Sequence, residues 1–394
     1  MAVAALLGSG AVCTRPVPVR PGIEVLLTDS LALVRGRRIG LLTNQTGVDG
    51  AGRDDLSRLR GAGLTVTALF SPEHGFCGVL DVENIGPGVD SATGLPVFSL
   101  YGSVLEPTPD MLARLDVVVV DLQDIGARTY TYVSTALRTL RAAGRAGVPV
   151  VVLDRPDPIG GTLVQGPVLD TAFASFVGML PVPLRHGMTL GELLRFGNDV
   201  LAIHGALSVV PAAGWRRDEW FDATGLPWVR PSPNMPSLES AAHYPGLVLF
   251  EATNLSVGRG TPIAFQILAA PWLDPRGVAA ELAGAPGVTI TDTVVVPRAP
   301  SDGKYDGVRL PALRFVVTDR ATYDPVRLAA HLLAAVERLH GDSLRLDALG
   351  FDRRAGTDRL RTAILAGAPP DSVAAGWRDE LARFAAVRRQ YLLY

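Results

Sequence analysis

The sequence predicts an α/β protein in which a parallel-sheet domain is followed by a second, α+β domain. From residue 37 to about residue 154, short apolar runs alternate with helix-like stretches. This alternation is typical of a parallel sheet that is covered by helices on both faces. After about residue 204, Pro and Gly become frequent and the alternation stops. The 394 residues, 48% of them hydrophobic, are enough for two cores of this kind.

Five apolar runs in the first part are predicted to be strands: Ile39–Thr43, Thr65–Phe70, Val97–Leu100, Val117–Leu122 and Val148–Leu153. These runs are unbroken and rich in β-branched residues, as expected for strands that are buried on both faces. The predicted helices are Asp54–Ala62, Tyr132–Ala146 and Thr189–Leu201. Thr189 and Glu192 have the spacing of a reciprocal helix cap. We therefore expect a Rossmann-like domain at residues 22–205, after an N-terminal extension or signal remnant at residues 1–21.

The second part contains strand-like runs and then helices in separate groups. The predicted strands are Leu247–Phe250, Ile263–Leu268, Val288–Val296 and Arg314–Thr318. The predicted helices are Pro325–Leu339, Asp358–Ala366 and Ser372–Ala386. Pro325 suits the first position of a helix, because a proline there loses no hydrogen bond. We expect an α+β auxiliary domain at residues 206–394.

Composition and missing motifs exclude several classes of function. The formal net charge is −2 and the basic residues are scattered, so no nucleic-acid partner is expected. The only lysine, Lys304, is followed by Tyr305 rather than Ser or Thr, which excludes a phosphate-binding P-loop. No dinucleotide fingerprint or dense set of metal ligands is present, so we expect no cofactor and no metal. No apolar run is long enough for a membrane span, and Cys13 and Cys77 cannot build a disulfide framework.

Polar residues follow the first two predicted strands at the point where each strand ends. Ligands bind beyond the carboxyl ends of the strands in open parallel sheets, so these residues are the first candidates for a site. Asn44 and Gln45 follow the first strand, and Glu73 and His74 follow the second. Glu73 comes after Pro72 in a tight turn, where a partly desolvated carboxyl can act as a general acid. The alternative is a carboxylate that only caps the turn.

The predicted strand at Val117–Leu122 is followed by a longer polar stretch. Asp124 and Glu73 together would suit glycoside cleavage, in which two carboxyl groups flank the scissile bond. Arg128 can clamp a substrate carboxylate with two hydrogen bonds. Tyr130 and Tyr132 lie on one side of an extended segment and can stack on a sugar. The alternative is that both tyrosines belong to the core and that Arg128 forms an ordinary ion pair.

Two stretches of the second domain also carry polar groups. A proline-rich loop presents Asn234 with little loss of entropy. A later stretch holds Glu251, Asn254 and Arg259. Ligands often bind between domains, so we expect both stretches to face the first domain across a cleft. The alternative is that they are ordinary turns near the domain boundary.

Six motifs occur together and in order: Leu42–Gly47, Phe70–Gly75, Asp121–Tyr132, Arg185–Thr189, Pro231–Pro236 and Gly258–Thr261. On these motifs the chain resembles the exo-β-N-acetylmuramidases, a bacterial family of peptidoglycan hexosaminidases. The resemblance extends from residue 22 to residue 394. It implies a Rossmann-like domain with an auxiliary domain, an active site in the cleft between them, and release of N-acetylmuramic acid from the non-reducing end of peptidoglycan fragments.

The resemblance also implies roles for individual residues. The catalytic glutamate of the family corresponds to Glu73, and a cation at Arg128 or Arg259 would bind the lactyl carboxylate of muramic acid. Asp124 is either a second carboxylate or the group that orients the acetamido group of the substrate. We expect the catalytic residues to be Glu73, Asp124 and Tyr130. We expect the substrate-binding residues to be Asn44, Gln45, His74, Arg128, Tyr132, Asn234, Glu251, Asn254 and Arg259.

Two other functions remain open at the level of the sequence. One is a muropeptide amidase, which a tightly bound metal would favour. The other is a saccharide-binding protein without catalytic activity. The expected partners are peptidoglycan-derived saccharides. This substrate points to secretion or to the cell envelope, and a cytoplasmic location also agrees with the sequence.

Overall fold

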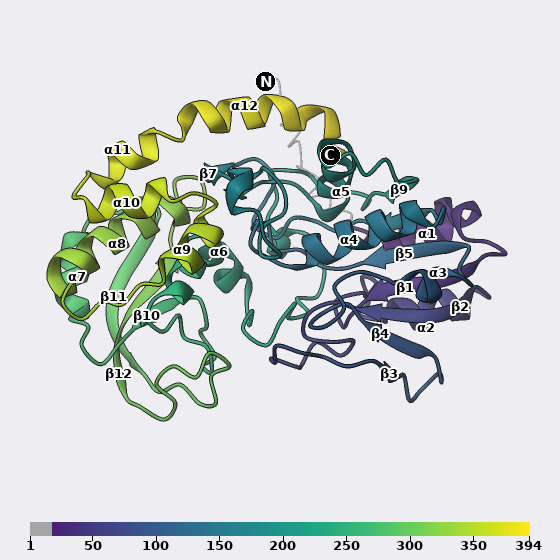
Figure 1. The fold of residues 1–394 in the computed structure, drawn as a ribbon, viewed down its shortest axis with the longest axis horizontal. Helices are drawn as coiled ribbons and strands as arrows, with labels where there is room; N and C mark the ends of the chain where they lie inside the picture. The colour runs from purple at the N-terminus through teal and green to yellow at the C-terminus, as the bar shows by residue number, and fades with distance from the viewer. Residues whose placement is uncertain (1–17) are drawn as a thin grey trace, which may run out of the picture.

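The computed structural model describes residues 18–394. Most of the predicted extension at residues 1–21, including Cys13, lies outside the described residues. The described chain forms two lobes that lie side by side (Figure 1). The first lobe is built on a large, mostly parallel sheet and the second on a small antiparallel sheet, which confirms the predicted fold class. No helix of residues 18–394 is long and apolar enough to cross a membrane.

The first lobe contains a seven-stranded sheet in the order β3-β4-β2-β1-β5-β6-β9. Its strands are β1 (Arg38–Thr43), β2 (Thr65–Ser71), β3 (Gly88–Val89), β4 (Pro96–Ser99), β5 (Val117–Asp121), β6 (Val150–Leu153) and β9 (Leu207–Val210). All neighbours are parallel except β3 and β4. The five predicted strands are confirmed. The sheet also includes β9, which lies beyond residue 205, where we expected the first domain to end.

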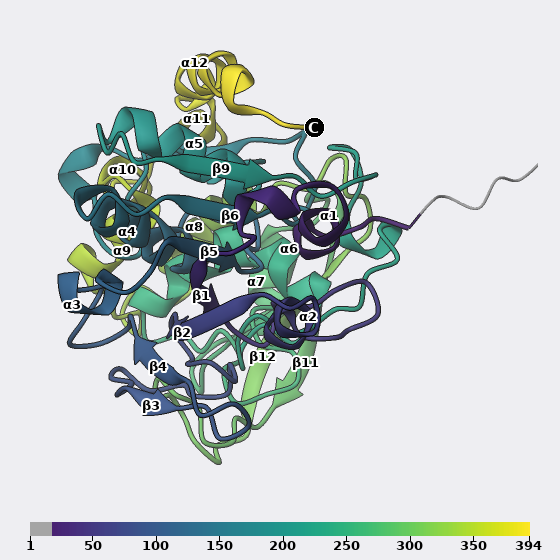
Figure 2. The ribbon, with the colours of Figure 1, turned by 90° about the vertical axis from the view of Figure 1, so that its right-hand side faces the viewer.

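Helices cover both faces of this sheet, as the alternating pattern predicts. They are α1 (Gly22–Asp29), α2 (Asp55–Gly61), α3 (Pro109–Leu112), α4 (Tyr132–Arg145) and α5 (Leu190–Val200). Successive strand residues point to opposite faces, so Leu41 packs in a core with α1 and α2, and Leu42 in the core that includes α4 and α5. Figure 2 shows α1 and α4 on opposite sides of the sheet. The predicted cap of α5 is confirmed by reciprocal hydrogen bonds between Thr189 and Glu192.

The second lobe has a three-stranded antiparallel sheet, ordered β10-β12-β11, with helices packed around it. Its strands are β10 (Ile267–Ala269), β11 (Val288–Val295) and β12 (Leu310–Val317). The helices are α6 (Leu238–Leu247), α7 (Pro275–Glu281), α8 (Pro325–His340), α9 (Ala348–Ala355), α10 (Arg359–Leu365), α11 (Pro370–Ala375) and α12 (Arg378–Arg388). A two-stranded ribbon, β7 (Gln165–Val168) with β8 (Pro183–Arg185), packs against α8 and α12.

Three predicted elements of the second domain differ from the structure. The run Leu247–Phe250 ends α6 and enters a 3₁₀ helix instead of forming a strand, because a short buried apolar run fits a strand and a helix equally well. Of the strand predicted at Ile263–Leu268, only the end is a strand, since Phe265 has a left-handed backbone with φ of 57°. The helix predicted at Ser372–Ala386 is divided into α11 and α12 by a Gly-Trp pair.

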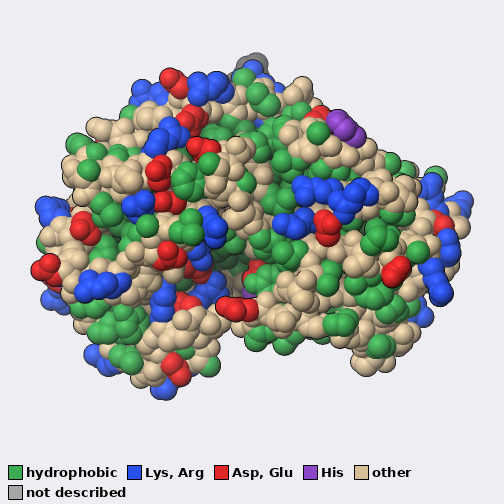
Figure 3. Space-filling model, viewed as in Figure 1, with side chains coloured by type: hydrophobic (Ala, Val, Ile, Leu, Met, Phe, Trp, Pro, Cys, Tyr) green, Lys and Arg blue, Asp and Glu red, His purple; other side chains and the backbone are tan. Residues whose placement is uncertain are grey.

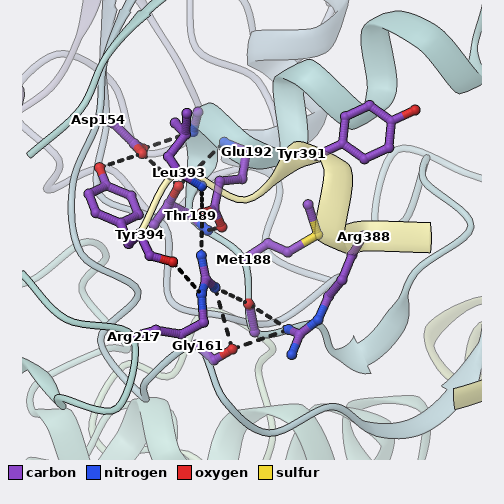
Figure 4. A network of polar contacts seen from close by, with 12 residues as sticks. Asp154, Gly161, Met188, Thr189, Glu192, Arg217, Arg388, Tyr391, Leu393 and Tyr394 are labelled. Carbon is purple, nitrogen blue, oxygen red and sulfur yellow. Dashed lines mark hydrogen bonds and ion pairs between the residues drawn. The ribbon is translucent and has the colours of Figure 1, made fainter. Parts of the chain in front are cut away.

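After α12 the chain returns to the first lobe, and we call residues 388–394 the anchoring segment (Figure 4). The Tyr394 hydroxyl donates a hydrogen bond of 2.8 Å to the buried Asp154 carboxylate. The backbone N–H of Leu393 donates a hydrogen bond of 2.7 Å to the Glu192 carboxylate. The Arg388 guanidinium is buried and donates at 2.7–3.2 Å to the backbone carbonyl oxygens of Gly161, Thr162, His186 and Gly187. These bonds tie the end of the second lobe to the first.

Candidate active site

The loops that follow β1, β2 and β5 begin at the same edge of the large sheet. β2 and β5 pair with opposite sides of β1, so the strand order reverses between β1 and β5, where ligands bind in folds of this type. Asn44, directly after β1, donates a hydrogen bond of 2.8 Å to the Tyr132 hydroxyl at the start of α4. That hydroxyl in turn donates to the carbonyl oxygen of Pro231. The predicted proline-rich loop therefore reaches the edge of the sheet.

Glu73 lies in a tight turn directly after β2. The next two residues, His74 and Gly75, have φ of 71° and 77°, so the chain turns sharply and the Glu73 side chain is left partly exposed. The His74 Nδ1 atom lies 2.8 Å from the carbonyl oxygen of Leu80, which fixes this left-handed residue. Thr131, the residue that precedes α4, donates a hydrogen bond from its hydroxyl group to Oε2 of Glu73. One oxygen of the carboxyl group is thus held in place.

Three buried tyrosines lie on one side of Glu73. Tyr130 packs edge-to-face against Tyr132 and Tyr244, with ring centroids 4.8 and 5.9 Å apart. Burial, and then the nearby charge of Glu73 among other groups, raises the pKa of each of these tyrosines. Tyr130 is only 6% exposed and its hydroxyl has no hydrogen-bond partner. A buried, unpaired hydroxyl beside a carboxylate is a group that a ligand can satisfy.

Polar residues of the second lobe meet the loop that follows Glu73. The Asn234 amide donates a hydrogen bond of 2.5 Å to Asp81. Arg259 pairs with Glu251 at 2.5 Å, and its Nη1 atom lies 3.6 Å from Asp81. Burial would raise the pKa of Glu251, but Arg259 and Arg354 outweigh burial and lower it. The space-filling view is hollowed between the lobes, with charged side chains around the hollow (Figure 3).

The Arg128 guanidinium forms hydrogen bonds to backbone carbonyl groups of the protein. It donates to the carbonyl oxygens of Pro167 (3.0 Å), Val182 (2.7 Å) and Arg354 (2.9 Å). The side chain is buried, and burial lowers its pKa to about 9. These bonds join the ribbon and the end of α9 to the loop before α4. Its terminal nitrogens are therefore bonded to backbone carbonyl groups, and within residues 18–394 Arg128 forms no ion pair with a carboxylate.

Two predicted binding residues also have partners that hold loops together. The Asn254 amide donates to the Ser343 carbonyl at 2.9 Å, and its oxygen accepts from the Arg345 backbone N–H at 2.9 Å. Asn254 therefore fixes the stretch between Glu251 and Arg259. The Gln45 amide donates to the Arg230 carbonyl at 2.7 Å, while its own oxygen is buried without a partner. Gln45 joins the loop after β1 to the proline-rich loop.

Four residues of this site are not among the predicted ones: Asp81, Tyr101, Thr131 and Tyr244. Tyr101 leaves the sheet beside Glu73, because Ser99 of β4 pairs with Ser71 of β2. It follows the predicted strand Val97–Leu100 directly, so the criterion that selected Asn44 and Glu73 also applies to it. Thr131 lies within the polar stretch after β5 that sequence analysis identified. Asp81 lies in a loop and Tyr244 on a helix that was not predicted, so no pattern in the sequence identifies them.

Asp124 lies in a separate buried cluster beneath the loop before α4. Its Oδ2 atom accepts a hydrogen bond of 2.8 Å from the Gly126 N–H and lies 3.5 Å from Nε2 of His186. Its other oxygen is buried without a partner, and burial raises the pKa of Asp124 to about 7. The same burial lowers the pKa of His186 to about 3, so this histidine is neutral. Within residues 18–394, no group of three or more His, Cys, Asp or Glu side chains is arranged to hold a metal ion.

We expect Asp124 to make the protein less stable as the pH rises from about 4 to about 7. In this range the folded protein keeps the Asp124 proton and the unfolded chain loses it, so the free energy of unfolding falls with pH. Asn cannot ionise, so Asp124→Asn removes this fall, which amounts to up to about 4 kcal/mol for a shift of three units. Urea denaturation of both proteins at pH 5 and pH 8 measures the difference. An equal difference at both pH values would contradict the prediction.

The sequence matches two family models in succession: the N-terminal domain of exo-β-N-acetylmuramidase NamZ at residues 39–239 and its C-terminal domain at residues 242–394. The chain is 38% identical over 381 residues to the peptidoglycan β-N-acetylmuramidase NamZ of Bacillus subtilis (strain 168), which covers 95% of this chain and 91% of the relative. Crystal structures of two DUF1343 family proteins from Bacteroides fragilis have TM-scores of 0.89 and 0.77 to this structure, with 32% and 30% identity. Each comparison covers 96% of this chain and 99% of the other. The chain belongs to the exo-β-N-acetylmuramidase NamZ family.

Proposed function

We propose that the protein is an exo-acting glycoside hydrolase that releases N-acetylmuramic acid from the non-reducing end of peptidoglycan fragments. The observation that carries this proposal is the position of Glu73. It is a partly exposed carboxyl group, held through one oxygen by Thr131 and with buried tyrosines on one side, at the edge of the sheet where ligands bind. The name of the Bacillus subtilis relative supports the class of substrate.

Glu73 acts as the general acid in this proposal. Thr131 holds Oε2, which leaves Oε1 to face the glycosidic oxygen and to deliver the proton as the bond breaks. The sugar develops the charge of an oxocarbenium ion as the bond breaks, and water completes the hydrolysis by adding to the anomeric carbon and losing a proton. The Tyr130 hydroxyl, which has no hydrogen-bond partner within residues 18–394, donates to an oxygen of the bound sugar. Asp124 acts as a positioning residue, because its carboxylate is bonded to the loop that carries Tyr130 and Thr131.

Arg259 is the cation that binds the lactyl carboxylate of muramic acid in this proposal. Its Nε and Nη2 atoms are bonded to Glu251, and its Nη1 side faces Asp81 and Ser301. A substrate carboxylate would replace Asp81 at this Nη1 atom, whereas the terminal nitrogens of Arg128 are bonded to backbone carbonyl groups. Arginine suits the task, because charge-assisted hydrogen bonds to carboxylates are strong.

We expect Arg259→Ala to abolish the preference for a charged lactyl group. Wild-type protein should hydrolyse an N-acetylmuraminide about tenfold or more faster, in kcat/KM, than its lactyl methyl ester, since the ester has no charge to pair. The variant should hydrolyse the two substrates at similar rates. Arg298→Ala is the matched control, because Arg298 is an exposed arginine of the same lobe. A preference that survives in Arg259→Ala would show that another group binds the carboxylate.

The direct test is hydrolysis of N-acetylmuramyl-β-1,4-N-acetylglucosamine by purified protein, with and without a chelator. We expect release of N-acetylmuramic acid that is insensitive to the chelator. Cleavage of an amide bond to a stem peptide, lost with the chelator, would indicate a muropeptide amidase instead. Binding of the disaccharide without turnover by folded protein would indicate a saccharide-binding protein.

A further inference from the structure

Glu73 lies between two groups of aromatic side chains that differ in exposure. Tyr130, Tyr132 and Tyr244 are buried on one side. On the other side lies Tyr101, which is partly exposed. β2 lies between β4 and β1 in the sheet, and Ser99 of β4 pairs with Ser71 of β2, so Tyr101 leaves the sheet beside Glu73 on the side away from β5. Burial, and then the charge of Glu73, raises the pKa of Tyr101. Two walls therefore border Glu73. The closed wall consists of the buried Tyr130, Tyr132 and Tyr244, and the open wall begins at the partly exposed Tyr101.

The open wall continues from Tyr101 to Phe176. The two rings lie with centroids 6.1 Å apart and their planes inclined at 43°. Phe176 is also partly exposed. It lies within a tight turn in which the backbones of Ser175 and Gly178 exchange hydrogen bonds of 3.0 and 3.1 Å. The turn holds the Phe176 ring next to Tyr101, although the two residues are 75 positions apart in the sequence.

Polar groups without partners accompany this aromatic pair. The guanidinium carbon of Arg138, on α4, lies 5.7 Å from the centre of the Phe176 ring. The Nε atom of Arg138 is buried and has no hydrogen-bond partner in the part of the chain that the structure describes. The Ser175 hydroxyl, next to Phe176, is also buried without a partner. Apolar ring faces beside unsatisfied donors are the combination that a sugar requires, because a pyranose has apolar C–H faces and a polar edge.

In an exo-acting hydrolase, the terminal sugar and the rest of the glycan bind on opposite sides of the catalytic residue. The terminal sugar enters a closed pocket, and the rest of the glycan extends from the scissile bond towards solvent. The buried tyrosines form the closed side of Glu73, so the leaving sugar must pass over the open side. We propose that Tyr101 and Phe176, with Arg138 and Ser175 beside them, form the subsite that binds the leaving sugar of the glycan. This inference rests on the proposed function.

The test compares two substrates that differ only in the leaving group. N-acetylmuramyl-β-1,4-N-acetylglucosamine has a sugar to stack on the aromatic pair, and methyl β-N-acetylmuraminide has none. Phe176→Ala should lower kcat/KM for the disaccharide about tenfold and leave the methyl glycoside within about twofold, as expected for the loss of one aromatic contact. Phe176→Trp should restore the disaccharide rate, because it restores a ring face.

Phe173→Ala is the matched control, since Phe173 is a partly exposed phenylalanine in the same connection between β7 and β8. It should leave both rates unchanged. An equal loss on both substrates in Phe176→Ala would assign Phe176 a structural role and overturn the subsite. Unchanged rates on both substrates would overturn it as well. If folded wild-type protein hydrolyses neither substrate, the proposed function fails, and the subsite fails with it.

Discussion

Replacing Glu73 by Gln is expected to lower kcat/KM for the disaccharide by about a thousandfold or more, because the amide cannot deliver a proton to the leaving oxygen. The substitution keeps the size of the side chain, and the amide oxygen can still accept the hydrogen bond from Thr131. The fold should therefore be unchanged, which urea denaturation checks. Hydrolysis of the disaccharide at matched protein concentration measures the effect.

A second substrate separates acid catalysis from a structural role of Glu73. A nitrophenyl N-acetylmuraminide has a leaving group that needs little protonation, so Glu73→Gln should slow its hydrolysis much less than that of the disaccharide. The control is Glu83→Gln, an exposed glutamate in the following loop, which should leave both rates unchanged. Equal losses on the two substrates, or more than about a tenth of the activity remaining on the disaccharide, would rule out Glu73 as the general acid.

Arg388→Ala is expected to lower the free energy of unfolding by about 3–5 kcal/mol. The guanidinium donates to four carbonyl groups of the first lobe, three of them in buried residues. Alanine removes this donor from the carbonyls of Thr162 and His186, while Arg217 still donates to those of Gly161 and Gly187. Arg389→Ala is the control, because the neighbouring side chain is exposed and should cost less than about 0.5 kcal/mol. Guanidinium denaturation of the three proteins measures the effect. A loss below about 1 kcal/mol in Arg388→Ala would show that water replaces these bonds easily.

The sequence identifies the first lobe well because its elements have strong local patterns. Strands buried on both faces are unbroken apolar runs, as in β5, and the Thr189–Glu192 cap marks a helix start without help from the rest of the fold. The second lobe has weaker patterns. The run Leu247–Phe250 is buried from all sides, and burial alone does not distinguish a helix from a strand. Only its tertiary neighbours decide its conformation.

The sequence predicts only the part of the candidate site that depends on local patterns. Residues placed by strand ends, such as Asn44 and Glu73, follow from the topology of a parallel sheet. The partners of Arg128 do not, because they are backbone carbonyls from segments 39 to 226 positions away in the sequence. Asp81 meets Asn234 and Arg259 only once the lobes have docked. Contacts of this range depend on how the lobes pack, which no local pattern encodes.

The anchoring segment also sets an order of events during synthesis. A ribosome extends the chain from its N-terminus, so Asp154 and Glu192 emerge long before residues 388–394, which bind them. Until then the first lobe is a folding intermediate, and its surface that binds residues 388–394 is exposed. The anchoring segment adds its bonds between the lobes only when residue 394 has left the exit tunnel. Hydrolytic activity is therefore expected only once the anchoring segment has been made, and a copy terminated before residue 388 should lack it.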